Sequence, residues 1–350
     1  MLLPCLPRTT LANEGTPLFA AAYRDTSGAF GAAIFDETGE IAQEVELPAR
    51  GHGFAVHRPS SRVVAFARRP GNFAVSFDHG GTAPPLWFQP PARHHFYGHG
   101  VFTPDGRLLF ATENEIASGR GIVGLYDATD GYRTVGAFPT GGIGPHDLAF
   151  MPDGRTLVVA NGGIRTDPGM GRTPLNIEDM QPSLAYIDTR NGDLLENVRL
   201  APGLHKLSMR HLAVTSRGLV VIGCQHKGPR NETPGLVVTH EMGAQPGEFP
   251  LPDAATRSLR NYVSSVAADA SGQYAAITSS KGGTVLVMDL QSRQLVKQQR
   301  IRDVSGVAPA KADGEAFFTT AGTGEIGRIG APGPLKTGSH AWDNHVIRVT

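Results

Sequence analysis

The sequence repeats one pattern six times: a short apolar run, a turn such as Pro-Asp-Gly or Ser-Gly, and a second apolar run. Asp-Gly between alternating apolar runs is a strong signal for a β-hairpin. Hairpins at a regular period predict a repeat architecture. Successive copies begin 47, 47, 65, 51 and 43 residues apart. Their starting residues are His52, His99, His146, His211, Tyr262 and Ser305.

Several hairpins continue into a third strand that ends in Asp and, after a polar turn, into a fourth strand. The third strands end at Asp36, Asp127, Asp188 and Asp289. Four antiparallel strands in about 40–50 residues form the blade of a β-propeller. The composition agrees, because 44 Gly and 26 Pro supply tight turns, while 18% charged residues are few for long amphipathic helices.

The two ends of the repeat array are complementary. Residues 18–47 hold only the second to fourth strands of a blade, and residues 341–350 hold one leftover strand. Pairing of these segments would close the ring and leave no open sheet edge. We therefore predict an all-β, seven-bladed β-propeller of four antiparallel strands per blade, closed by the C-terminal strand. It would form a single domain over residues 18–350, preceded by an N-terminal arm or signal remnant at residues 1–17.

The charge pattern restricts the partners. Lys and Arg together number 32, as do Asp and Glu, so there is no basic field for nucleic acid and no polybasic run for an anionic membrane. No apolar run is long enough to span a bilayer. We expect a monomer whose partner is a small molecule, a metal or a periplasmic protein.

Polar residues recur at two steps of the repeat. In a propeller blade, the turn into strand one and the turn between strands two and three lie on the same face. Histidine fills the first step in four consecutive blades, and neutral imidazole is a common ligand of transition metals. The candidate metal ligands are His52, His99, His146 and His211. The candidate ligand-binding residues at the same mouth are Arg68, Glu113, Asn114, Asn161, Arg210, Gln225, Tyr262 and Asn344.

A structural role for these histidines is the alternative interpretation. The Gly-His pair of WD-type repeats hydrogen-bonds within its own blade, and channel histidines can simply hold water. Residues 164–183 form an insertion between strands two and three of one blade, which explains the spacing of 65. We expect the insertion to cover part of the mouth, because long loops are often lids or binding loops. A loop that docks a partner is the alternative.

The third copy, residues 145–161, resembles the repeat of YVTN-type and quinoprotein-like propellers. Residues 96–100, 159–163, 210–212 and 303–306 resemble a bacterial seven-bladed propeller family of unknown function. The resemblance covers roughly residues 18–350. It implies an exported, periplasmic protein. It also implies a role linked to iron, because family members tend to be encoded beside imelysin-like and di-haem oxidoreductase-like proteins.

These observations predict an exported propeller that binds a ligand or a metal at its histidine-lined mouth, with a role in iron acquisition. A transition metal ion held by histidine is the candidate cofactor. An enzyme of the lactonase or quinoprotein-dehydrogenase type, or a protein-interaction scaffold, remains an alternative, because propellers host all three. The sequence has no recognisable nucleophile elbow, nucleotide-binding loop or Cys-x-x-Cys-His haem motif, which disfavours an enzyme.

Overall fold

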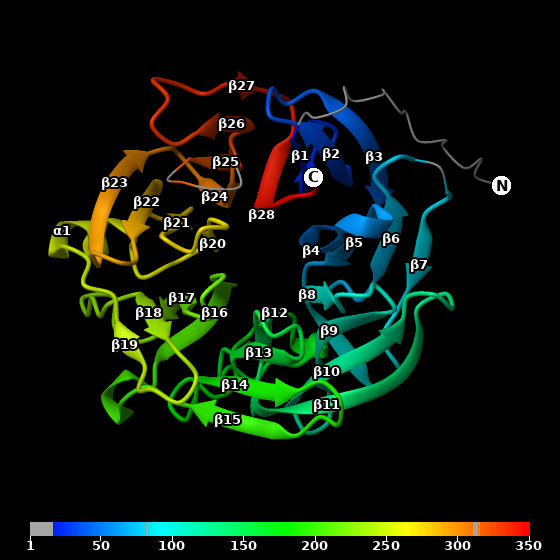
Figure 1. Cartoon of the computed structure of the whole chain (residues 1–350), viewed down its shortest axis with the longest axis horizontal. Helices are drawn as coiled ribbons and strands as arrows, with labels where there is room; N and C mark the ends of the chain where they lie inside the picture. The colour runs from blue at the N-terminus through cyan, green and yellow to red at the C-terminus, as the bar shows by residue number, and fades with distance from the viewer. Residues whose placement is uncertain (1–16, 82, 311–313, 315) are drawn as a thin grey trace.

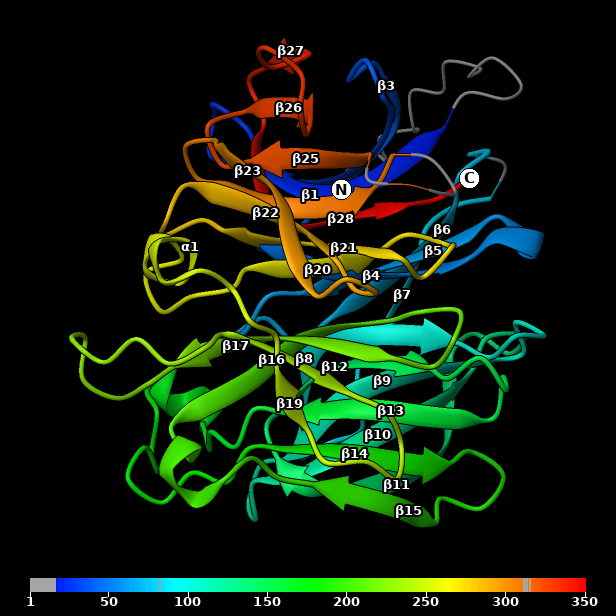
Figure 2. The ribbon, with the colours of Figure 1, turned by 60° about the vertical axis from the view of Figure 1, so that its left-hand side comes forward.

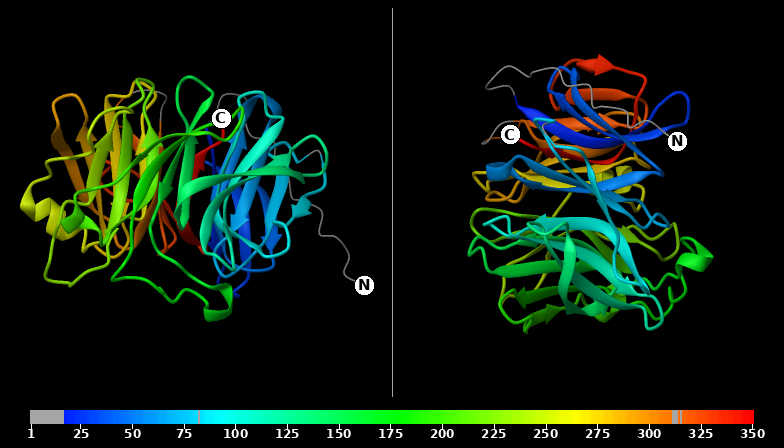
Figure 3. Two further views of the ribbon diagram at one scale, coloured as in Figure 1. Left: turned by 90° about the horizontal axis from the view of Figure 1, so that it is seen from below. Right: turned by 90° about the vertical axis from the view of Figure 1, so that its right-hand side faces the viewer.

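The computed structural model describes residues 17–81, 83–310, 314 and 316–350. Seven antiparallel sheets of four strands each surround a central axis (Figure 1). Side views show the sheets stacked next to one another around the ring (Figures 2 and 3). The predicted seven-bladed β-propeller is therefore confirmed.

The innermost strand of each blade contacts the innermost strands of its two neighbours, and the contacts run completely around the ring. These strands are β28 (Ala341–Arg348), β4 (Gly51–His57), β8 (His94–Phe102), β12 (Pro145–Phe150), β16 (Leu207–Val214), β20 (Ser265–Ala268) and β24 (Val304–Pro309).

The two middle strands of each blade are buried along most of their length, because neighbouring blades cover both faces of the sheet. The second strands are β1 (Leu18–Arg24), β5 (Arg62–Ala67), β9 (Leu108–Glu115), β13 (Thr156–Asn161), β17 (Val220–His226), β21 (Tyr274–Ser279) and β25 (Phe317–Ala321). The third strands are β2 (Phe30–Asp36), β6 (Ala74–Asp78), β10 (Arg120–Asp127), β14 (Ser183–Asp188), β18 (Val237–His240), β22 (Thr284–Asp289) and β26 (Glu325–Arg328).

The outermost strands face solvent on one side, and β23 alternates between exposed and half-buried positions as a half-buried strand should. They are β3 (Ile41–Leu47), β7 (Leu86–Phe88), β11 (Arg133–Ile143), β15 (Leu194–Val198), β19 (Gly247–Glu248), β23 (Gln294–Arg300) and β27 (Lys336–Thr337). The described helices are short: η1 (Arg58–Ser60), η2 (Pro168–Met170), η3 (Pro202–Leu204) and α1 (Asp253–Ser258). Within the described ranges, no helix has the length and hydropathy needed to cross a bilayer.

The ring closes through the C-terminal strand. β28 pairs with β1 in an antiparallel ladder in which Ala21 faces Val346, and it forms the inner edge of the first blade (Figure 1). Side-chain packing stabilises the closure, because the Phe19 ring of the first blade stacks on the Phe318 ring of the seventh, with 4.3 Å between the ring centroids. The closure predicted from the two incomplete ends is confirmed.

The Asp residues at the ends of the third strands organise the turns that follow. Asp36 Oδ1 accepts a hydrogen bond from the Thr38 backbone N–H at 2.8 Å, and Asp127 Oδ1 accepts one from Thr129 at 2.9 Å. Such Asx turns reverse the chain and stabilise the hairpin into the fourth strand. These carboxylates are structural and lie away from the axis.

Candidate functional site

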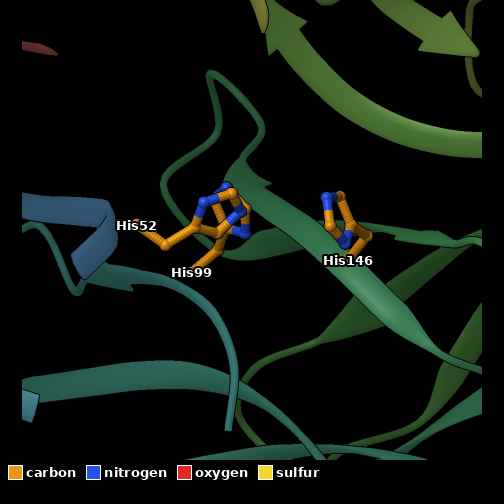
Figure 4. A group of neighbouring side chains, drawn as sticks. All are labelled: His52, His99 and His146. Carbon is orange, nitrogen blue, oxygen red and sulfur yellow. The ribbon is translucent and has the colours of Figure 1, made fainter. Parts of the chain in front are cut away.

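Five histidines meet at the axis of the ring and form what we call the histidine layer. They come from the innermost strands of five consecutive blades and are His345, His52, His99, His146 and His211. Successive ring centroids around the layer lie between 4.6 and 5.1 Å apart. Figure 4 shows three of them, with the rings of His52 and His99 close together and His146 on the neighbouring strand. The four predicted histidines therefore lie together, and His345 joins them as a fifth.

β-Bulges aim these side chains at the axis. The pairing of the innermost strand with the second strand shifts between Gly51 and Phe54, and similarly between Phe96 and Gly100. Comparable shifts span His146 and the stretch of β28 that holds His345, and in β16 the shift leaves out Arg210, directly before His211. A bulge leaves one residue out of the ladder and redirects its side chain. The same local irregularity therefore accompanies each histidine, with His211 paired to Gly223 directly after its bulge.

Glycines allow the first two histidine strands to approach closely. A Cβ on Gly53 would lie 2.4 Å from the Gly98 carbonyl oxygen, and a Cβ on Gly98 would lie 2.7 Å from the His52 ring. Gly98 also has a φ of +101°, which residues with side chains rarely adopt. The Gly residues around His52 and His99 are thus required by the close packing of the two rings.

Polar groups surround the layer at short range. His99 Nε2 lies 3.3 Å from His345 Nε2, and the opposite nitrogen of His345, Nδ1, lies 3.2 Å from the Ser265 hydroxyl. Carboxylates flank the layer on two sides: Asp343 Oδ1 is 3.6 Å from His52 Nδ1, and Asp147 Oδ2 is 3.9 Å from His211 Nδ1.

The two carboxylates differ in their charge balance. Asp343 pairs with the guanidinium groups of Arg50 and Arg68. Asp147 accepts hydrogen bonds from the backbone N–H groups of Leu148 and Leu212, at 2.9 and 3.2 Å. In the described part of the chain, no Lys or Arg forms an ion pair with Asp147. Asp147 is therefore a buried carboxyl group next to His211 without a basic side chain to pair with it in this part of the chain, and burial raises its pKa.

Burial keeps the imidazoles neutral. The pKa values of all five histidines are lowered, primarily because burial disfavours the charged form. Mutual repulsion among the rings lowers the pKa of His52 further. The buried Nδ1 atoms of His52, His99 and His211 have no hydrogen-bond partner among the described residues. The layer thus presents neutral nitrogen donors, the form that binds metals.

A cavity of about 410 Å³ lies on one side of the layer, and we call it the basic chamber. It is formed by the turns at the predicted mouth and by the insertion, which contributes Thr166, Arg172 and Pro174. The insertion therefore covers part of the mouth, as expected. The basic residues that line the chamber are Arg68, Arg69, Arg172, Arg210, Lys227 and Lys281.

A second cavity of about 720 Å³ lies on the other side of the layer, and we call it the apolar chamber. It is lined by the later residues of the innermost strands, such as Ala55, Leu148 and Val307, and by Asp147. His99 and His345 face this chamber, His52 and His146 face the basic chamber, and His211 borders both.

Comparison with known proteins identifies the family. The model of a family described as "Protein of unknown function (DUF1513)" matches residues 45–349. The chain belongs to this family. No curated protein matches the sequence.

Solved structures support the fold of this DUF1513 member. A chain of hydrazine synthase from Kuenenia stuttgartiensis is similar, with a TM-score of 0.65 and 17% identity over 92% of this chain and 98% of that chain. The β-propeller domain of Cps50 (Swd1) from Myceliophteria thermophila has a TM-score of 0.61 and 13% identity, covering 90% and 95% of the two chains. At these identities the likeness concerns the propeller fold alone.

The predicted ligand-binding residues separate into two groups. Five of them line the basic chamber: Arg68, Arg210, Gln225, Tyr262 and Asn344. The other three, Glu113, Asn114 and Asn161, are buried inside their blades and do not line it.

The position of the second strand explains the buried group. β9 continues through Glu115, so Glu113 lies within the ladder and not in the turn. Its carboxylate accepts a hydrogen bond from the Tyr126 hydroxyl and contacts His94 Nδ1 at 2.8 Å. Asn161 is the last residue of β13 and donates from its amide to the Thr140 carbonyl at 3.1 Å.

Sequence reasoning did not include several residues that contribute to the site. His345 lies on β28, the innermost strand of the first blade, and was not among the predicted metal ligands. Arg69, Lys227 and Lys281 follow the second strands of their blades, so the repeat position could have identified them. Arg172 lies within the insertion, where no repeat position applies.

Proposed function

We propose that the protein binds a transition metal ion in the histidine layer, with His99, His211 and His345 as its ligands. The observation that carries this proposal is the mutual distance of their nitrogens, all within 4.8 Å of one another. A tetrahedral ion with bonds of about 2.1 Å holds its ligand nitrogens roughly 3.4 Å apart. The 3.3 Å between the Nε2 atoms of His99 and His345 already matches this spacing.

A second triad, His52, His99 and His146, satisfies the same distance limit and shares His99. Electrostatics favours the first triad. Arg210 Nη1 lies 3.3 Å from His146 Nδ1, and a guanidinium there repels a divalent cation. Asp147 is next to His211 and attracts one. The ion would therefore lie on the side of the layer that faces the apolar chamber.

The ligand types narrow the choice of metal. Imidazoles with a nearby carboxylate suit Fe(II), Zn(II), Cu(II) and Ni(II) better than Mg(II) or Ca(II), which prefer oxygen ligands. The family resemblance makes iron the first metal to test. A role in iron acquisition and a periplasmic location are part of this proposal, and the apolar chamber would supply the route to the ion.

Metal binding can be tested on the purified chain. After metal removal, we expect titration with Fe(II), Zn(II) and Cu(II) to give one ion per chain. X-ray absorption should report three imidazole ligands. His99→Ala should abolish binding, because His99 belongs to both triads, whereas His205→Ala changes an exposed histidine and should have no effect.

Two results would contradict the proposal. One is the absence of stoichiometric binding by any of the three metals in the folded wild-type protein. The other is unchanged binding in folded His99→Ala. If the substitution prevents folding, His345→Gln provides the same test, because it removes an imidazole of the preferred triad and retains a polar side chain.

A further inference from the structure

The basic chamber concentrates positive charge without matching acidic groups. Six basic residues line it, and no Asp or Glu is among its described lining residues. Arg210 is buried, Arg68, Arg69 and Lys227 are half-buried, and Arg172 and Lys281 lie at the exposed rim. The protein as a whole has no net charge, so the chamber is a local feature.

Most of these charges have neutral partners. Arg69 donates to the Thr166 hydroxyl at 2.8 Å and stacks on the Tyr97 ring at 4.1 Å. Lys227 donates to the Gln225 side-chain oxygen at 2.9 Å.

Only Arg68, of the six basic residues that line the chamber, has a carboxylate partner among the described residues, and that partner is Asp343. Lys281 lies over the Tyr262 ring at 4.5 Å. Arg210 Nε is buried and has no hydrogen-bond partner among the described residues.

Such an arrangement is costly in an empty cavity. A charge removed from water is normally paired, and an unpaired one destabilises the folded state. Burial, together with repulsion from Arg210, Lys281 and Arg172, lowers the pKa of Lys227 to about 6. A bound anion would supply the missing negative charge and the missing acceptor for Arg210 Nε.

We propose that the basic chamber binds a small polyanion, a molecule with two or three carboxylate or phosphate groups. The volume of about 410 Å³ is in the range of small-molecule pockets. Guanidinium groups bind both oxyanions through paired hydrogen bonds, and Arg69 and Arg210 supply them from different blades. The side chain of Arg172, which belongs to the insertion, would contact the anion from the exposed rim of the chamber.

This inference does not depend on the proposed metal. The chamber ends at His52, His146 and His211, so the anion would lie next to the metal position, yet its contacts come from other side chains. Anion binding is therefore measured on metal-free protein, and metal binding in a buffer without polyanions. Failure of one proposal leaves the other measurable.

The test is calorimetric titration of metal-free wild-type protein with citrate, with inorganic pyrophosphate and with the neutral polyol erythritol. We expect one site for at least one anion, weaker binding at higher salt, and no binding of erythritol. Citrate and pyrophosphate affinities then distinguish a carboxylate ligand from a phosphate ligand.

Substitutions locate the site. Arg69→Met should weaken anion binding about tenfold or more, because it removes a charged donor from inside the chamber. Arg172→Met, at the rim of the same chamber, should weaken it by a smaller factor and is expected to fold. Arg165→Met is the matched control, because Arg165 is an exposed arginine of the same insertion that does not line the chamber.

Three outcomes would overturn the proposal. Neither anion binds at millimolar concentration, or erythritol binds as tightly as the anions, or Arg165→Met weakens binding as much as Arg172→Met. If Arg69→Met fails to fold, the contrast between Arg172→Met and Arg165→Met decides the question.

Discussion

The two chambers on either side of the histidine layer have opposite character, although the same seven blades build both. The basic chamber is lined largely by residues at strand ends and by the insertion, and six of its lining residues are Arg or Lys. The apolar chamber is lined mainly by the innermost strands themselves and carries many small apolar residues, with Asp147, Asp269, Arg58 and Arg348 as its charged residues.

The difference follows from backbone geometry. Turns tolerate varied sequences, so a propeller can collect charged side chains on the face where its turns meet. Innermost strands must pack against their neighbours around the ring, which favours small apolar residues. The histidines lie at the boundary, where bulges interrupt the strands. The comparison teaches that one fold can place a cavity lined by basic residues and a mainly apolar cavity on opposite sides of a single layer of histidines.

The largest expected effect comes from removing β28, the strand that lines both chambers. Deletion of residues 339–350 removes β28, which carries Asn344 into the basic chamber and His345 into the apolar one. It also exposes the edges of β1 and leaves a gap in the ring, so we expect insoluble or aggregated protein. Light scattering and the soluble yield measure this, and a soluble product with an unchanged melting temperature would contradict ring closure.

Asp147→Asn should weaken metal binding about 10- to 100-fold, the usual range for groups that contact a metal ligand without binding the metal themselves. The reason is the loss of the carboxyl group beside His211, which a bound cation would hold in its charged form. Asp269→Asn is the matched control, since Asp269 also lines the apolar chamber but accepts hydrogen bonds from Ser271 and the Tyr274 backbone. If the two variants bind the metal with equal affinity in titrations, Asp147 has no special effect on the ion, and the electrostatic argument that places the ion next to the apolar chamber is wrong.

Acid should destabilise the metal-free protein. The folded pKa values of the five histidines lie below the ordinary value near 6.5, so the unfolded chain binds more protons below that pH. The contribution of the histidines to stability is therefore constant above about pH 6.5 and falls as the pH decreases below it, by up to about 1.4 kcal/mol per pH unit for each histidine. Lys227, whose pKa burial lowers to about 6, adds a loss that already begins at higher pH, because the unfolded chain keeps this amine protonated. His94 opposes this trend, because Glu113 raises its pKa.

Urea unfolding at pH 7.5 and 5.5 measures the effect, and we expect a loss of a few kcal/mol. His146→Gln should reduce the loss, whereas His205→Gln, at an exposed position, should leave it unchanged. A wild-type stability that is independent of pH between these values would show that the layer is not held neutral by burial.

The smallest effect concerns Lys227 in the basic chamber. Lys227→Met should weaken anion binding about tenfold and raise the melting temperature of the empty protein by a few degrees, because burial of this amine is unfavourable.

Calorimetry of the wild-type protein in two buffers of different ionisation enthalpy should also show proton uptake on anion binding at pH 7.5. The pKa of about 6 leaves Lys227 mainly neutral in the empty chamber, and an anion favours its protonated form. A Lys227→Met protein that is less stable than the wild type and binds the anion equally well would place Lys227 outside the anion site.

The sequence predicted the fold because each blade is a local unit with its own hairpin signals. Asp-Gly turns, apolar runs and two complementary chain ends were sufficient to predict seven blades and the closure of the ring. The candidate site was predicted in part. Four histidines at one repeat position could be identified, as could Arg68 and Arg210, because the repeat fixes which face a position lies on. The position of Glu113 could not be predicted. The pairing of β9 with β10 extends beyond Glu113, so this residue lies inside the blade and not in the turn at the mouth.

The sequence by itself determined the repeat, the number of blades and the face on which the histidines and the insertion lie. These properties depend on short-range patterns that every blade carries. Only the tertiary structure decided that five imidazoles meet within 4.6 to 5.1 Å of their neighbours and that Arg172 joins Arg69 and Arg210 in one chamber. It also decided that Asp147 has no Lys or Arg partner within the described ranges. These contacts join residues of different blades, and the distances across the axis depend on how the whole ring closes.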